Sequence, residues 1–154
     1  MNTNKYPLSR KVITDDLFDG AVELYIGGDV ISLRRSVECY HPGYPLGGDD
    51  QLSRSGITYY STNPATGDSA IIVWLPNPTA GDPITMIATL CHEAVHAVLK
   101  LLQRRVGLTP EQIFNAEEVL AYATGHYFEE FARAFAGYAR KHNLLKLGNG
   151  IKMA

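Results

Sequence analysis

The chain has 154 residues, the size of one ordinary domain and enough to bury a hydrophobic core. Apolar residues make up 45% and charged residues 19%, which excludes an intrinsically disordered chain. A formal net charge of -2 argues against a nucleic-acid-binding protein, because such proteins normally carry a basic excess. We therefore expect a single globular domain, residues 1–154, with no nucleic-acid partner.

The number of cysteines and the length of the apolar runs indicate the cellular compartment of the protein. Cys39 and Cys91 are too few for a disulfide framework, and the setting of Cys91 predicts a buried small side chain. Residues 1–10 are polar and lack the apolar core of a signal peptide, and no apolar run reaches membrane-spanning length. The sequence therefore predicts a soluble, cytoplasmic protein with no membrane partner, and it leaves the oligomeric state open.

The first half of the chain reads as strands and loops. Thr14, followed by two aspartates, could begin a short helix. Alternating apolar residues around a Gly-Gly turn predict a hairpin over residues 21–35. Glycines, prolines and aspartates predict a long loop over residues 38–56, and a second hairpin is predicted over residues 57–75.

The second half reads as helices. Asp82 as N-cap and Pro83 at the first helical position begin a helix that runs to about Val106, where Gly107 closes it. Its apolar stripe is expected to consist of Ile84, Ile87, Ala88, Cys91, Val95, Val98 and Leu102.

A further helical region follows, with two alternative starting points. Thr109 begins a Thr-x-x-Gln capping box, so one helix could start at 110, or a short turn could precede a helix from 116. Helix then continues to about His142, and residues 148–154 read as a frayed tail. The fold class predicted is α+β: a small antiparallel sheet packed on two or more helices, with residues 1–80 mostly strands and loops and residues 81–147 helical.

One HExxH motif lies in the first long helix. Residues four apart share a helix face, so His92 and His96 can offer two imidazole nitrogens to one metal ion. Glu93 is rotated by roughly 100° from His92, so it suits a general base better than a ligand. Two histidines and a carboxylate among apolar neighbours would be costly to bury without a partner, and a metal is the simplest partner. A structural helix without metal is the alternative.

The third ligand is inferred from helix geometry. From His96 to Val106 the helix rises about 15 Å, and from Pro110 to Glu118 an antiparallel neighbour returns about 12 Å. Glu118 therefore comes back nearly to the level of His96. Glu117 is the rival, and solvated helix charges are the alternative for both. The sequence predicts one Zn²⁺ per chain held by His92, His96 and Glu118.

These residues resemble a known family. His92-Glu93-Ala94-Val95-His96 followed by Glu118-x-x-Ala121-Tyr122-x-x-Gly125 resembles the compact gluzincin metallopeptidases, in particular small HExxH proteins of tailed phages and prophages. The resemblance covers about residues 84–128. It implies a small sheet packed on the two helices, with an edge strand just before the HExxH helix. The run Ala70–Leu75 occupies that place, and in gluzincins such a strand pairs with an extended peptide substrate.

The chemistry expected is metal-assisted hydrolysis of a protein or peptide substrate, with Glu93 as general base. Tyr122 and His126 follow Glu118 on roughly its face and are candidates to stabilise the oxyanion. The alternative for Tyr122 is core packing, and the alternative for His126 is a partly buried histidine with its hydrogen bonds satisfied. Well-known gluzincins carry an acidic residue where this chain has Tyr122, so the partner that orients a zinc histidine is not identified.

Other readings stay open. The chain could be a non-catalytic binding or interaction module on a zincin scaffold with a structural metal, or an amidase acting on a non-peptide amide such as cell-wall material. Cys39 and His41 form a short C-x-H pair that could belong to a second metal site or be a coincidence in a loop. Histidine and carboxylate ligands would also accept manganese or cobalt. If the protein is encoded by a phage, the host cytoplasm is its expected location.

Overall fold

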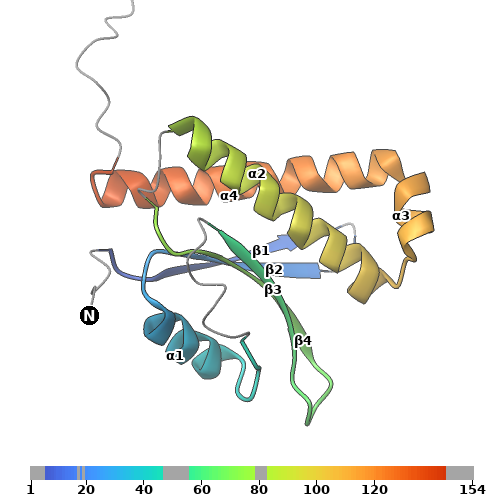
Figure 1. Cartoon of the computed structure of the whole chain (residues 1–154), viewed down its shortest axis with the longest axis horizontal. Coiled ribbons are helices and arrows are strands. Elements are labelled where there is room, and N and C mark those ends of the chain that lie inside the picture. Colours follow the sequence, from blue (N-terminus) through green and yellow to red (C-terminus); the bar gives the residue numbers. More distant parts are fainter. Residues whose placement is uncertain (1–5, 17, 19, 47–55, 79–82, 145–154) are drawn as a thin grey trace, which may run out of the picture.

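The computed structural model describes residues 6–16, 18, 20–46, 56–78 and 83–144. They form a four-stranded mixed sheet of order β1-β2-β4-β3 with helices on both faces. In Figure 1, α2 and α4 lie above the sheet and α1 lies below it. The α+β architecture predicted from the sequence is confirmed.

Two antiparallel hairpins supply the sheet. β1 (Ser9–Asp15) pairs with β2 (Gly20–Ile26), and β3 (Ile57–Thr62) pairs with β4 (Ser69–Leu75). The second of these is the hairpin predicted over residues 57–75, which is confirmed.

The two hairpins join through a parallel pairing of β2 with β4, in which Val22 lies opposite Ile71. The sequence had predicted an antiparallel sheet, and the run Ala70–Leu75 as its edge strand. The parallel pairing makes that run an internal strand, and β3 is the edge strand beside α2. A parallel pair needs a long connection, which α1 and β3 provide between the two strands.

The predicted hairpin over residues 21–35 is wrong in its second arm, which is α1 (Val30–Tyr40). The chain turns at Gly27–Gly28, where both glycines have positive φ. Asp29 then caps the helix: its carboxylate accepts from the Ser32 backbone, and the Ser32 hydroxyl contacts the Asp29 backbone N–H. This capping box redirects the apolar residues that follow from a strand into a helix.

The short helix suggested for Thr14 is also absent. Thr14 lies in β1, and the Asp15 carboxylate accepts a hydrogen bond of 2.6 Å from the Phe18 backbone N–H. The aspartate therefore stabilises the turn between β1 and β2, a role that Asp fulfils as readily as helix capping.

Only part of the predicted long loop over residues 38–56 is described. Its first residues complete α1, and residues 41–46 follow without helix or strand. Residues 47–55, the predicted N-cap Asp82 and the predicted tail 148–154 lie outside the described residues.

The first long helix is confirmed. α2 (Pro83–Lys100) continues as a π-helical segment, η2 (Leu101–Val106), and ends at Gly107 with φ 80°. Within the described residues, the segment Pro83–Val106 is the one helix long and apolar enough to cross a membrane by length and composition. Core helices of soluble proteins meet the same criterion, so this carries little weight.

The second helical region has both of the features that the sequence left as alternatives. α3 (Pro110–Asn115) begins at the capping box of Thr109 and Gln112, and a separate helix, α4 (Glu117–Lys141), follows. Aromatic residues of α4 pack in the core: Tyr127, Phe131 and Tyr138 are buried, and Phe128 and Phe135 pack against the same core cluster.

The buried face of α2 differs from the predicted one. Ile84 is 78% exposed, Ile87 is 54% exposed and Cys91 is also exposed, whereas Val98 and Leu102 are buried as predicted. The sheet and α4 instead cover a neighbouring stripe made of Met86, Leu90, Glu93, Ala94, Ala97 and Leu101. Because α2 is apolar on most of its circumference, its pattern does not single out one face.

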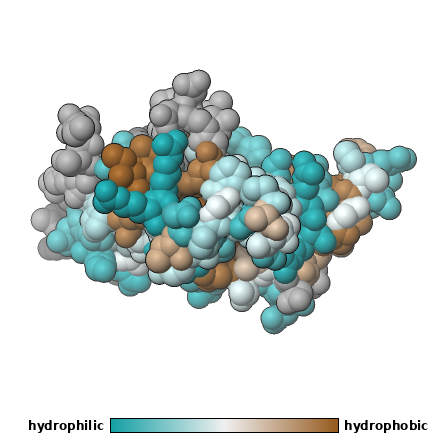
Figure 2. Space-filling model, turned by 90° about the horizontal axis from the view of Figure 1, so that it is seen from below, coloured by the Kyte–Doolittle hydropathy of each residue, from teal (hydrophilic) through white to brown (hydrophobic). Residues whose placement is uncertain are grey.

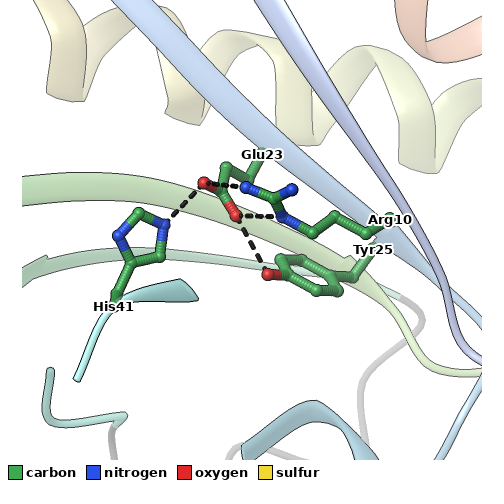
Figure 3. Close-up of polar contacts among 4 residues, drawn as sticks. All are labelled: Arg10, Glu23, Tyr25 and His41. Atoms are coloured by element: carbon green, nitrogen blue, oxygen red, sulfur yellow. Dashed lines mark hydrogen bonds and ion pairs between the residues drawn. The ribbon is translucent and has the colours of Figure 1, made fainter. Parts of the chain in front are cut away.

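A polar cluster lies on the side of the sheet that faces α1 (Figure 3). Glu23 of β2 is 6% exposed and accepts two hydrogen bonds of 2.8 Å from Arg10 and one of 2.9 Å from Tyr25. His41, just after α1, lies 2.5 Å from the same carboxylate. The cluster ties β1, β2 and the end of α1 together, and it engages His41, which had been considered with Cys39 as a metal ligand.

Burial alone would raise the pKa of Glu23. The hydrogen bonds from Arg10, His41 and Tyr25 outweigh that effect and hold the pKa of this carboxyl below its ordinary value. Burial and the adjacent carboxylate raise the pKa of Tyr25 to about 12. Seen from below, the surface on this side is mostly hydrophilic with smaller hydrophobic patches (Figure 2).

The lowered pKa of Glu23 makes stability depend on pH. Because the folded state holds the carboxylate deprotonated more firmly than the unfolded chain, its contribution is present above about pH 4.3 and is lost as pH falls through the folded pKa. We expect Glu23→Gln to flatten the fall in stability between about pH 5 and pH 3, measured by urea unfolding. Glu129→Gln, an exposed control, should keep the slope of the wild type. Equal slopes in wild type and Glu23→Gln would contradict this assignment.

Candidate metal centre and groove

His92 and His96 lie on the exposed side of α2, one turn apart. Their Nε2 atoms are 3.0 Å from each other, and the rings meet edge to face with centroids 4.5 Å apart. Two nitrogens bound at about 2.0–2.1 Å to one tetrahedral ion would be separated by about 3.3 Å. The pair is therefore close to the geometry in which both imidazoles bind the same ion.

Glu93 lies beside the histidine pair but on the inner side of the helix. It is 3% exposed, and its Oε2 accepts a hydrogen bond of 2.6 Å from the Thr58 hydroxyl of β3. A buried carboxylate is costly unless it is hydrogen-bonded, and Thr58 supplies a bond. This contact also fixes the orientation of the carboxylate relative to the edge strand.

Gly56 allows the edge strand to approach Glu93 closely. A Cβ atom at position 56 would lie 2.8 Å from both Glu93 Cγ and Glu93 Oε1, and 2.9 Å from a methyl group of Thr89. Distances this short require a neighbour to move. The glycine therefore leaves the space beside Glu93 Oε1 that a Cβ atom would fill.

An open groove of about 620 Å³ runs between α2 and β3 and contains these residues. β3 contributes its first residues and the preceding Gly56, and α2 contributes a row of side chains one turn apart. The lining residues are Gly56, Ile57, Thr58, Thr85, Ala88, Thr89, His92, Glu93, His96 and Lys100. The groove thus combines a hydrogen-bonded acid, two imidazoles and an ammonium group beside the edge of a sheet.

The other predicted site residues lie outside the groove, in α4. Glu117 and Glu118 are exposed in the first turn of α4, where a negative charge interacts favourably with the helix dipole. Neither residue lines the groove. Tyr122 and His126 line a different cavity, of about 290 Å³, together with Asp15 at the end of β1. The roles predicted for these four residues stay predictions.

A divalent ion would find two of its ligands in the described part of the chain. The facing Nε2 atoms of His92 and His96 fit an ion of the zinc type, because imidazole nitrogen is a preferred ligand. Across the described ranges 6–16, 18, 20–46, 56–78 and 83–144, no group of three or more His, Cys, Asp or Glu side chains converges on one point. The described residues therefore supply two ligands for a metal ion, His92 and His96, and no third one beside them.

Sequence analysis missed Thr58, Gly56 and Lys100. Lys100 could have been found, because it continues the four-residue spacing of His92 and His96 along the same helix. Thr58 and Gly56 come from a strand far away in the sequence, so no local pattern links them to Glu93. Comparisons of the chain with protein-family models, with curated proteins and with solved structures gave no match, so the site is interpreted from its own geometry.

The Thr58–Glu93 hydrogen bond should contribute measurably to stability. Thr58→Val keeps the shape of the side chain but leaves the buried carboxylate without this donor, which we expect to cost about 1–3 kcal/mol. Thr62→Val is the matched control, since Thr62 is exposed at the end of the same strand. Chemical denaturation of both variants checks this, and equal unfolding free energies would show that Thr58 contributes nothing to holding Glu93.

Proposed function

We propose that the protein is a metal-dependent hydrolase acting on peptide bonds. The observation that carries the proposal is the approach of His92 Nε2 and His96 Nε2 to 3.0 Å beside the buried carboxylate of Glu93 in an open groove. Histidine pairs of this spacing with an adjacent glutamate suit metal-assisted hydrolysis. Zinc is the expected ion, and the resemblance to compact gluzincins supports the same reaction.

An ion held by the two imidazoles would lower the pKa of a bound water and polarise a carbonyl. Glu93 supplies the base: its Oε2 is occupied by Thr58, and Oε1 is left to take a proton from the attacking water and return it to the leaving amine. Low exposure keeps bulk water from competing at the carboxylate. The base is thus held in one orientation before the substrate arrives.

The edge strand supports a polypeptide as the substrate. β3 is the last strand of the sheet, so its outer edge pairs with no strand among the described residues. An extended segment can add to such an edge through backbone hydrogen bonds, which do not depend on its sequence. A segment added to β3 would lie along the groove and pass the histidine pair.

A second candidate function is a binding module on the same scaffold. The observation that favours it is the exposed position of Glu117 and Glu118, neither of which lines the groove that holds His92 and His96. In that case an extended segment of a partner protein would occupy the groove without being cut, and any metal would be structural.

Metal content is the first measurement. We expect about one zinc per chain by elemental analysis, lost in His96→Ala and retained in His142→Ala, whose ring packs at a tilt against Tyr138 in another part of the molecule. Glu118→Gln tests the third ligand and should weaken zinc affinity by about tenfold or more, whereas Glu117→Gln, which changes the rival candidate, should leave it unchanged. Wild-type protein that binds no zinc after zinc addition would refute the proposal.

Activity distinguishes the two candidate functions. Glu93→Gln should retain zinc and lose peptide hydrolysis by about 10²–10⁴-fold, because the general base is removed. Glu111→Gln, an exposed glutamate of α3, is the matched control and should hydrolyse as wild type does. Undiminished hydrolysis by Glu93→Gln would refute the mechanism. A partner that wild type and Glu93→Gln both bind and leave intact would instead support the binding module.

A further inference from the structure

The groove has one end with a positive charge. Lys100 lines it one turn beyond His96, so that His92, His96 and Lys100 form a row at four-residue spacing along α2. Side chains at this spacing lie on one face of the helix. A ligand that contacts the two histidines therefore also passes the Lys100 ammonium group.

Lys100 has no acidic partner within the part of the chain that the structure describes. The ion pairs found there use Arg10, Lys11, His41 and Arg133 as their cations. The carboxylate in the groove, Glu93, is bonded to Thr58. Lys100 has intermediate exposure and lines the groove, where a carboxylate of a ligand can pair with its ammonium group.

Helix stabilisation does not account for Lys100. A lysine in the last turn of a helix interacts favourably with the terminal carbonyl groups. Helical hydrogen bonding here continues beyond Lys100 through η2, and Arg104 and Arg105 occupy its last turn. Lys100 is therefore in the interior of a continuous helical segment.

Arg104 is held in another way. Its guanidinium lies 5.6 Å from the centre of the Tyr60 ring, and Tyr60 is on β3 beyond Thr58. The arginine is thus attracted to an aromatic ring at the end of the edge strand. Among the described residues that line the groove, Lys100 is therefore the one lysine or arginine.

We propose that the Lys100 end of the groove binds a carboxylate of an extended peptide, about two residues from the segment that faces His96. The spacing follows from geometry: four residues of helix rise about 6 Å, and an extended chain covers about 3.3 Å per residue. Side chains two residues apart point the same way from an extended chain. The inference rests on the proposed function in taking a peptide as the ligand, and it adds an acidic residue or a C-terminal carboxylate as the specificity element.

Peptide pools of known composition test the subsite. The probes are fluorescein-labelled, C-terminally amidated octapeptides of random sequence with Glu, Gln or Lys fixed at each position in turn. A parallel set with a free C-terminal carboxylate separates a terminal from a side-chain carboxylate. Binding is measured by fluorescence anisotropy on zinc-loaded Glu93→Gln protein, so that hydrolysis does not consume the probe.

The expected result is that pools with Glu at one position, or with a free C terminus, bind about fivefold more tightly than their Gln or amide counterparts. The preference should vanish in Lys100→Met and turn toward Lys in Lys100→Glu, each combined with Glu93→Gln. Lys141→Met is the matched control, because Lys141 lines a different cavity beside β1. Equal binding of acidic and neutral pools, or a preference that survives in Lys100→Met, overturns the subsite.

Hydrolysis of the same pools by wild-type protein is the second readout. Cleavage without acidic preference overturns the subsite and leaves the hydrolase standing. Acidic preference in binding without any cleavage supports the subsite and overturns the hydrolase.

Discussion

The structure depends on the two central strands, β2 and β4, being buried on both faces. Val22, Leu24 and Val73 are fully buried under α2 and α4, while Tyr25 and Trp74 are buried on the side of α1. Burying both faces requires helices on each side, as in parallel sheets generally. Trp74 adds a hydrogen bond of 2.8 Å from its indole N–H to the Gly27 carbonyl, which fixes the turn before α1. The placement of each helix therefore follows from this pair of strands.

The groove is a consequence of how α2 covers the sheet. α2 lies over β4 and β3, and α4 lies over β1 and β2, so one flank of α2 faces α4 and the other faces the open edge. Glu93 is on the boundary between the core and that open flank, which explains why it is buried and yet lines the groove. His92 and His96 are turned further outward. One helix therefore supplies both a buried, hydrogen-bonded carboxylate and two exposed imidazoles.

Local signals in the sequence were sufficient for the α+β class, the 57–75 hairpin, the helix end at Gly107, the helix start at Thr109 and the placement of His92 and His96 one turn apart. Local signals failed to predict the strand order, which depends on pairing between distant segments. Nothing near the Ala70–Leu75 run indicates that β2 will pair with it. Local signals also failed where an unrecognised Asp29 capping box turned an apolar stretch from strand to helix. Helix rise fixes the height of Glu118 along its helix but not the side on which the residue lies, so its role as the third ligand stays a prediction.

The parallel pairing has a consequence for how the chain folds. Each hairpin and each neighbouring pair of helices forms from segments close in sequence, whereas β2 meets β4 only after α1 and β3 have been traversed. Pairing of distant segments loses loop entropy before it gains contacts, and this slows folding. The docking of two preformed hairpins is therefore the expected slow step. Before the hairpins dock, the edges of β2 and β4 are unpaired. Because unpaired strand edges can pair with other chains, we expect the protein to be most prone to aggregation at this stage of folding.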